Sequence, residues 1–192
     1  LHPIMFLPWD ATKFILQSQR DGYNHLYLYN IEGDCLKQLT TGQWVVMDVL
    51  GFNTKQKSII IASNEHHPLQ CNLFAVNVAT ARRTSLDNGQ GVHRGKLSAS
   101  GIKLYDRYTE PTVPRNIDIV NTATAKSKRL LTAEDPWKDY RQPIFENGAI
   151  TAADGATTLY YRMVKPSDFD PQKKYPTVVY VYGGPHAHNV DA

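Results

Sequence analysis

L-Y-L-Y-N-I-E-G, at residues 26–33, indicates how the chain folds, because the sequence contains three versions of this segment. Each version alternates apolar residues with others until it reaches an Asn and then a small or polar turn, which is typical of a half-buried β-strand followed by a hairpin. The other two versions are L-F-A-V-N-V-A-T at residues 73–80 and I-D-I-V-N-T-A-T at residues 117–124. The sequence therefore predicts a fold built from repeated β units.

The spacing of the repeat indicates which β fold it builds. The three Asn residues are Asn30, Asn77 and Asn121, so the steps are 77 − 30 = 47 and 121 − 77 = 44 residues. Each copy is preceded by another strand pattern, such as I-I-I-A-S from Ile59, and the clearest strand that follows a copy is S-K-R-L-L-T from Ser127. About four strands in roughly 45 residues is typical of one blade of a β-propeller. The 3.6-residue periodicity that helical repeats require is absent.

Three blades do not close a propeller, since propellers contain about four to eight. We therefore expect about three blades in residues 1–138 and the remaining blades before Leu1. The repeat stops in the polar, proline-containing stretch A-E-D-P-W-K-D-Y, which ends at Tyr140. We expect residues 139–192 to begin a second domain.

Composition and charge exclude several classes of protein. Of the 192 residues, 42% are hydrophobic, and the formal net charge of +3 is dispersed, so we expect a soluble globular protein and no nucleic-acid partner. No apolar run approaches the roughly 20 residues that span a bilayer. Cys35 and Cys71 have no metal-ligand spacing, and we expect two free thiols packed as small hydrophobes.

The second region has the pattern of the beginning of an α/β domain. Strand patterns at residues 145–151 and 158–164 flank an Asp154-Gly155 turn, and a proline-containing loop follows at residues 165–174. The uncharged run T-V-V-Y-V-Y at residues 177–182 then predicts a strand that is buried on both faces. A hairpin that leads through a loop into a buried strand is typical of the start of an α/β domain.

This predicted strand ends at Gly183-Gly184-Pro185. Two glycines permit a sharp turn, and the proline fixes φ and removes a donor, so Tyr182 is expected at the carboxyl end of a sheet strand. Ligands bind at that end of the strands in open α/β sheets. The motif Y-V-Y-G-G-P therefore predicts an active-site turn.

The residues resemble a known family of peptidases. The run L-Y-Y-R-M-V-K-P-S-D-F-D-P-Q-K-K-Y-P-T-V-V-Y-V-Y-G-G-P, residues 159–185, resembles the entry into the α/β-hydrolase domain of the prolyl oligopeptidase family of serine peptidases, with K-K-Y-P and Y-G-G-P as its specific elements. Upstream, residues 21–29, 39–46 and 62–65 resemble the last propeller blades of the dipeptidyl peptidase IV branch, especially its bacterial members. The resemblance covers essentially the whole chain in the right order.

The resemblance implies the fold and activity of the complete protein. The expected fold of this chain is mostly β, with a partial β-propeller of about three blades followed by the first strands of an α/β-hydrolase domain. For the complete protein, the resemblance implies an eight-bladed propeller that caps this domain, a Ser-Asp-His triad, and release of dipeptides with Pro or Ala at the second position from peptide N-termini. The resemblance also implies a homodimer that is periplasmic or secreted and that acts on peptide substrates. We expect no cofactor and no metal.

Tyr182 is the one catalytic residue that the resemblance assigns to this chain. In the family, the Tyr of the Y-G-G-P or Y-A-G-P motif donates its hydroxyl to the oxyanion hole. Such a donor stabilises the negative oxygen of a tetrahedral intermediate more than it stabilises the ground-state carbonyl. The chain departs from the branch at His188, where the branch usually has Gln, and the departure leaves Tyr182 unchanged.

The triad itself is expected outside the chain. No Ser stands in G-x-S-x-G, and the nearest look-alike, around Ser98, lacks the first Gly and is expected to be a turn. Because the triad order in α/β-hydrolases is Ser, Asp, His, all three are expected after Ala192, and the chain alone is expected to be inactive. The glutamate pair that binds the substrate amine in this family is expected before Leu1. Glu65 and Glu134 are predicted to be surface or turn acids.

Histidines close together in sequence invite a metal interpretation. They are His66 with His67 and His186 with His188, but no carboxylate or Cys stands at ligand spacing nearby. We expect all four to be exposed loop histidines.

Two other functions fit the same residues. One keeps the family but makes the enzyme an acylaminoacyl peptidase or an endo-acting oligopeptidase, which the paired glutamates before Leu1 would distinguish. The other is a binding module in which the propeller recognises a protein and the hydrolase part is inactive, which a G-x-S-x-G motif after Ala192 would exclude.

Overall fold

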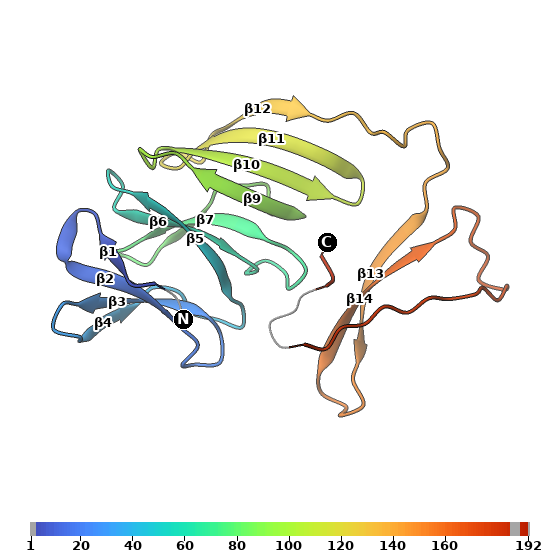
Figure 1. Ribbon diagram of the computed structural model, residues 1–192, viewed down its shortest axis with the longest axis horizontal. Coiled ribbons are helices and arrows are strands. Elements are labelled where there is room, and N and C mark those ends of the chain that lie inside the picture. The colour runs from blue at the N-terminus through green and yellow to red at the C-terminus, as the bar shows by residue number, and fades with distance from the viewer. Residues whose placement is uncertain (1–2, 185–188, 192) are drawn as a thin grey trace. The chain divides into compact units, whose positions relative to one another are not determined.

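The three copies of the repeat fold as three four-stranded antiparallel sheets in the computed structural model, which describes residues 3–184 and 189–191 (Figure 1). In each sheet the strands follow one another in chain order, so each strand pairs with the next through a hairpin. A meander of four strands is the unit from which a β-propeller is built. The prediction of about four strands per copy is therefore confirmed.

Every regular element in the described residues is a β-strand. The first sheet contains β1 (Met5–Leu7), β2 (Asp10–Ser18), β3 (His25–Asn30) and β4 (Cys35–Gln38). The second contains β5 (Val46–Asn53), β6 (Ser58–Ser63), β7 (Asn72–Asn77) and β8 (Arg83–Ser85). The third contains β9 (Val92–Leu97), β10 (Lys103–Glu110), β11 (Val113–Asn121) and β12 (Ser127–Thr132).

The repeated Asn closes the turn between the third and fourth strands of each sheet. Asn77 Oδ1 accepts hydrogen bonds from the backbone N–H groups two and three residues later, at 3.1 and 2.9 Å, and Asn121 Oδ1 does the same at 2.9 and 3.3 Å. In the shorter turn of the first sheet, Asn30 Oδ1 accepts from the backbone N–H of Asp34 at 2.7 Å. A short amide side chain that bonds the backbone ahead of it stabilises such turns, which explains why the repeat contains Asn here.

The second sheet is covered on both faces by its neighbours. All six residues of β6 are buried, and successive side chains point to opposite faces of the sheet. Ile59 and Ile61 join the apolar cluster shared with the first sheet, and Ile60 and Ala62 join the one shared with the third. The core of this unit therefore lies between the sheets, as it does between the blades of a propeller.

Close approach of the second and third sheets requires glycine at one position. Gly101, in the turn between β9 and β10, has φ of 71°, and a Cβ built on it would lie 2.1 Å from the carbonyl oxygen of Phe52. Beside it, the Thr122 hydroxyl donates to the Gly101 carbonyl at 2.7 Å and accepts from the Asn53 amide at 2.8 Å. Backbone contact and a buried polar chain thus join the two sheets.

The second compact unit is Glu134–Ala192, and the first is Leu1–Ala133. The division falls five residues before the domain boundary expected after residue 138 (138 − 133 = 5). Within the second unit, β13 (Ile144–Thr151) and β14 (Thr158–Lys165) form an antiparallel hairpin, as the sequence predicted. Asp154 accepts hydrogen bonds from Thr157 and Ala156 in the connecting turn, which lowers the pKa of its carboxyl group to about 2.

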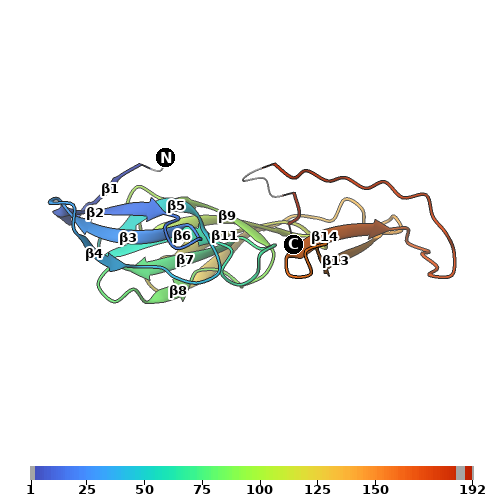
Figure 2. The ribbon, with the colours of Figure 1, turned by 90° about the horizontal axis from the view of Figure 1, so that it is seen from below.

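The strand predicted at residues 177–182 is absent. The described part of the chain gives these residues no strand partner, and Val178 and Tyr182 are 96% and 62% exposed. Figure 2 shows them as an extended trace apart from the β13–β14 hairpin. The prediction of a buried strand was wrong because apolar and β-branched side chains favour a strand but do not supply the neighbouring backbone that a sheet requires.

The two cysteines differ in their surroundings. Cys71 is buried among the apolar residues between the second and third sheets, as expected. Cys35 is exposed, and the prediction that it packs as a small hydrophobe was wrong. Its strand, β4, is the last of its sheet, where one edge has no neighbour within that sheet.

Candidate active site

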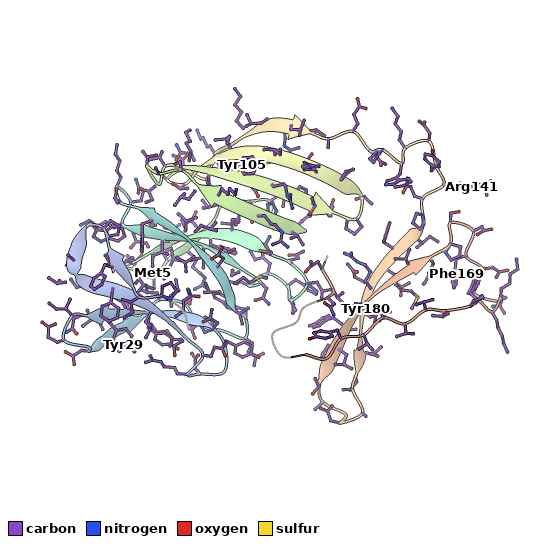
Figure 3. The ribbon with its side chains drawn as sticks, viewed as in Figure 1. Met5, Tyr29, Tyr105, Arg141, Phe169 and Tyr180 are labelled. Carbon is purple, nitrogen blue, oxygen red and sulfur yellow. The ribbon has the colours of Figure 1, made fainter. Side chains whose placement is uncertain are left out.

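The segment that contains Tyr182 leaves the β13–β14 hairpin through a closed loop. The backbone N–H of Asp170 donates to the Tyr175 hydroxyl at 2.9 Å, and the Tyr175 ring stacks on Phe169 with 5.2 Å between ring centroids. The ammonium of Lys165, the last residue of β14, lies 4.9 Å from the centre of the Phe169 ring. Phe169 is labelled in Figure 3. These contacts close the proline-containing loop, so they hold in place Tyr175, from which the segment that contains Tyr182 continues.

Side chains on one face of the hairpin anchor this loop. Glu146 on β13 accepts hydrogen bonds from the Lys165 ammonium and, at 3.0 Å, from the Tyr161 hydroxyl. These two donors, Lys165 first, hold the pKa of the Glu146 carboxyl below its usual value. The Tyr161 ring in turn covers Gly148, its cross-strand partner, where a Cβ would lie 2.5 Å from the ring.

A second attachment lies beyond the segment. The Arg162 guanidinium, on β14, donates a hydrogen bond to the carbonyl oxygen of Asp191. The chain is therefore attached to the hairpin on both sides of Tyr182, at the loop that ends with Tyr175 and at Asp191.

Tyr182 itself is an accessible phenol on this segment. Its side chain is exposed, and its hydroxyl has no hydrogen-bond partner in residues 3–184 and 189–191. The ring folds back over Gly184, where a Cβ would lie 2.6 Å from the hydroxyl oxygen of Tyr182. An O–H donor with no internal acceptor is able to donate to a bound ligand.

Other residues singled out by the sequence have structural surroundings of their own. Ser98 lies in the β9–β10 turn, where its hydroxyl is 3.1 Å from that of Ser100, as predicted for a turn serine. Glu65, in the β6–β7 connection, accepts hydrogen bonds of 2.6–3.0 Å from the Arg83 guanidinium. Glu134 is exposed, as predicted.

The histidines considered as metal ligands divide into two pairs. His66 and His67 are exposed in the loop before β7, as expected. His186 and His188 lie outside the described residues. Across the described part of the chain, no three His, Cys, Asp or Glu side chains are grouped so as to hold a metal ion. That part of the chain also has no helix long and apolar enough to cross a membrane.

A buried charged cluster in the third sheet was not predicted from the sequence. His93 Nδ1 lies 2.8 Å from a carboxylate oxygen of Asp106, and Nε2 lies 2.9 Å from the Gln90 carbonyl and 3.1 Å from Asn88 Oδ1. The ring stacks on Tyr108 with 4.7 Å between centroids. The sequence contains one signal of this cluster. Asp106 stands between Leu104 and Tyr108 in the alternating positions of β10 that are buried, where an unpaired carboxylate would be unfavourable.

The surroundings of His93 indicate that its ring is charged. The Asp106 carboxylate and the Gln90 carbonyl both accept hydrogen bonds, so both ring nitrogens carry protons. Burial of the ring lowers the pKa of His93, but the hydrogen bond to Asp106 and the negative charges of Asp87 and Asp106 outweigh it, and the pKa lies above its ordinary value. Burial also raises the pKa of the Asp106 carboxyl, which the hydrogen bond from His93 opposes.

This pair does not have the geometry of a catalytic dyad. In a hydrolase triad, Nε2 of the His faces the hydroxyl of the nucleophile, whereas Nε2 of His93 faces a backbone carbonyl. The His93 ring is also only 2% exposed, so no substrate reaches it. The cluster fastens the loop before β9 to β10 and is structural.

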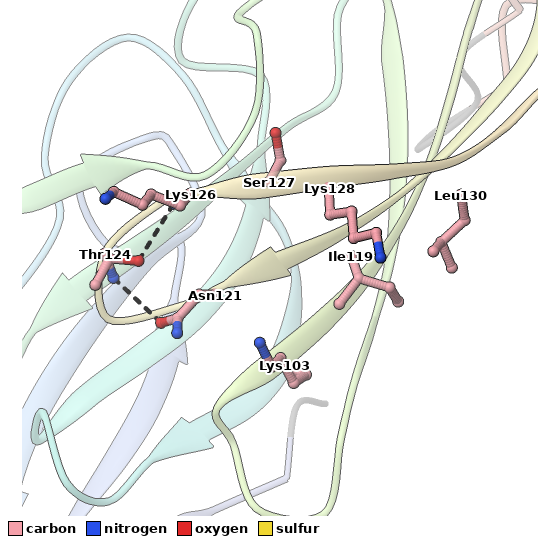
Figure 4. A pocket seen from close by; sticks show the side chains of 8 residues that line it. All are labelled: Lys103, Ile119, Asn121, Thr124, Lys126, Ser127, Lys128 and Leu130. Atoms are coloured by element: carbon pink, nitrogen blue, oxygen red, sulfur yellow. Dashed lines mark hydrogen bonds between the residues drawn. The ribbon is translucent and has the colours of Figure 1, made fainter.

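An open depression lies beside the Asn121 turn, on the third sheet. Its volume is about 530 Å³, and its lining residues are Lys103, Ile119, Asn121, Thr124, Lys126, Ser127, Lys128 and Leu130 (Figure 4). The lining contains three ammonium groups but no carboxylate, imidazole or thiol that would serve as a base or nucleophile. It brings together none of the residues expected to act in catalysis.

Proteins similar to this chain include several named as dipeptidyl peptidases. A sequence profile described as the dipeptidyl peptidase IV (DPP IV) N-terminal region matches residues 1–115. A crystal structure of a Bacteroides ovatus protein assigned as a dipeptidyl aminopeptidase IV has a TM-score of 0.87 and 47% identity, covering 97% of this chain and 29% of that one. The Porphyromonas gingivalis dipeptidyl peptidase 4 structure has a TM-score of 0.80 and 25% identity, covering 90% and 24%.

Fungal relatives give the same result. Dipeptidyl peptidase 4 of Trichophyton rubrum is 30% identical over 179 residues, which is 90% of this chain and 23% of the relative. The chain thus spans about a quarter of the length of the proteins it resembles. The profile match over more than half of the chain, together with the four-stranded sheets, shows that the chain belongs to the dipeptidyl peptidase IV family and contains part of its N-terminal propeller region.

Proposed function

We propose that this chain is part of a longer serine exopeptidase that releases N-terminal X-Pro or X-Ala dipeptides from peptides through an acyl-enzyme. The observation that carries the proposal is the order of the parts. Propeller sheets of the dipeptidyl peptidase IV family are followed, within one chain, by a hairpin, an anchored loop and the Y-G-G-P motif. The 47% identity to the Bacteroides ovatus protein over nearly the whole chain supports the same assignment.

Tyr182 is the catalytic residue that this chain contributes. When the nucleophile adds to the scissile carbonyl, negative charge develops on the carbonyl oxygen, and the Tyr182 hydroxyl donates a hydrogen bond to it. The donor acts mainly in the transition state, where the oxygen is anionic, and it therefore lowers the barrier more than it strengthens substrate binding. Its exposure and its lack of a partner in the described residues are compatible with this role.

The remaining catalytic groups belong to the rest of the proposed peptidase. The Ser, Asp and His of the triad would follow this chain, and the carboxylates that hold the substrate amine would precede it. Residues 1–192 alone would therefore be inactive, since an oxyanion donor without a nucleophile forms no acyl-enzyme. The peptidase would act as a homodimer in the periplasm or outside the cell, which light scattering and cell fractionation would test.

The substrate preference of the full-length protein tests the proposed activity. We expect it to release p-nitroaniline from Ala-Pro-p-nitroanilide and Gly-Pro-p-nitroanilide, and to lose this activity when the substrate amine is acetylated. Cleavage of acetyl-Ala-p-nitroanilide would instead indicate an acylaminoacyl peptidase. Cleavage of amine-blocked Gly-Pro substrates would indicate an oligopeptidase. A folded protein that hydrolyses none of them would indicate a binding module and would contradict the proposal.

A further inference from the structure

Two glycines follow Tyr182, and they differ in what surrounds them. A Cβ built on Gly183 would have no atom within 4 Å, so a side chain at that position would meet open space. A Cβ built on Gly184 would lie 2.5 Å from Cε1 of Tyr182, 2.6 Å from Cζ and 2.6 Å from the hydroxyl oxygen. The space that a side chain would need at residue 184 is therefore already occupied by the tip of the Tyr182 ring.

Backbone conformation does not explain a glycine at this position. Neither Gly183 nor Gly184 is among the glycines with positive φ, which include Gly22, Gly33 and Gly155 in other turns. A residue with a side chain can adopt the φ of Gly184 without the strain of the left-handed region. The one observed reason for a missing Cβ at residue 184 is the ring of Tyr182.

A Tyr ring also lies over a glycine on the β13–β14 hairpin, but there the Tyr hydroxyl is bound within the protein. The Tyr161 ring covers Gly148, but the Tyr161 hydroxyl is held by Glu146 at 3.0 Å. The Tyr182 hydroxyl has no such acceptor in the described residues, and the Tyr182 ring is largely exposed. In the described residues, therefore, neither a hydrogen bond to its hydroxyl nor a packed core fixes the Tyr182 ring, which lies over Gly184.

We propose that Gly184 is a positioning residue for the Tyr182 hydroxyl. The inference rests on the proposed oxyanion role of Tyr182, and it adds that the missing side chain at residue 184 allows the ring to lie over the backbone with the hydroxyl at one place. A methyl group at residue 184 would displace the exposed ring, which moves with little cost to the fold. The predicted consequence is a misplaced donor and a slower acyl transfer in an intact protein.

Three substitutions in the full-length peptidase test this inference, with Ala-Pro-p-nitroanilide as substrate. Rates are divided by the number of sites labelled by a fluorophosphonate, so that misfolded protein is not counted. Gly184→Ala is expected to lower kcat by about 10 to 10²-fold with KM changed by less than about threefold, because the lost interaction belongs to the transition state. Gly183→Ala, the matched control, is expected to retain kcat within about twofold because its Cβ meets open space.

The double variant separates this inference from the function on which it rests. If Gly184 acts through the Tyr182 hydroxyl, then Tyr182→Phe combined with Gly184→Ala should be no slower than Tyr182→Phe alone, since the two changes remove one interaction. Additive losses would overturn the positioning role, and so would a Gly184→Ala variant with wild-type kcat. If Tyr182→Phe alone has wild-type kcat, that result contradicts the oxyanion role of Tyr182 itself, whatever the effect of Gly184→Ala.

Discussion

At the scale of single residues, two alanines in the repeat adopt a conformation that favours glycine. Ala81 and Ala125 have φ of 61° and 56° and occupy the same place, four residues after the repeated Asn. The shorter turn of the first sheet has Gly33 at the corresponding place, with φ of 93°. An L-residue in this region carries steric strain between its Cβ and the backbone.

Replacement of one of these alanines by glycine should stabilise the protein. We expect Ala125→Gly to raise the free energy of unfolding by about 0.5 to 1 kcal/mol, because relief of strain exceeds the added entropy of the unfolded chain. Urea unfolding followed by tryptophan fluorescence measures the change. Ala123→Gly in the same turn is the control and should not stabilise, because Ala123 has no positive φ. Equal effects of the two changes would contradict this explanation.

The His93 cluster gives stability that depends on pH. The pKa of His93 is raised in the folded protein, so its contribution is fully present below the unfolded value of about 6.5 and is lost as pH rises through the folded pKa. His93→Gln should destabilise the protein by about 3 to 5 kcal/mol at pH 6, because Asp87 and Asp106 then lack the buried cation.

The difference between wild type and His93→Gln should therefore become smaller from pH 6 to pH 9. Urea unfolding at both values measures it. Lys96→Gln, on the same strand but outside the cluster, should show no such dependence. A difference between wild type and His93→Gln that is constant over this range would contradict a charged ring.

At the scale of elements, the contact between the second and third sheets at Gly101 is sensitive to substitution. Gly101→Ala should lower the free energy of unfolding by about 3 kcal/mol or more, since its Cβ would overlap the Phe52 carbonyl and its φ is also left-handed. Gly155→Ala provides the control, because its φ is 73° with no atom within 4 Å of the added Cβ. It should cost only about 1 to 2 kcal/mol from the backbone strain. Equal losses would mean that close approach is unimportant.

Sequence patterns predicted the elements that are stabilised by their own neighbours along the chain. The hairpins of each sheet and the β13–β14 hairpin join adjacent strands, so alternation and turn residues were sufficient. Residues 177–182 show the limit of such patterns. Their apolar side chains favour a buried strand, but the pattern does not show whether a neighbouring strand is present to pair with them. The His93–Asp106 pair depends on a contact across two strands, which no local pattern contains.

At the scale of the whole molecule, the chain combines propeller sheets with a unit whose apolar side chains are largely uncovered. Residues 178–182 are between 62% and 96% exposed, and Ile150 and Val164 of the hairpin are 58% and 57% exposed. The chain spans only about a quarter of the length of its relatives. In the proposed peptidase, the rest of the protein would cover part of this apolar surface.

The steady-state kinetics of Tyr182→Phe in the full-length protein show whether Tyr182 is the oxyanion donor of a dipeptidyl peptidase. The substitution removes one oxygen and keeps the ring. We predict that kcat for Ala-Pro-p-nitroanilide falls by about 10² to 10³-fold while KM stays within about threefold, because the hydrogen bond forms mainly in the transition state. An unchanged kcat, or a rise in KM alone, would show that Tyr182 is not the oxyanion donor.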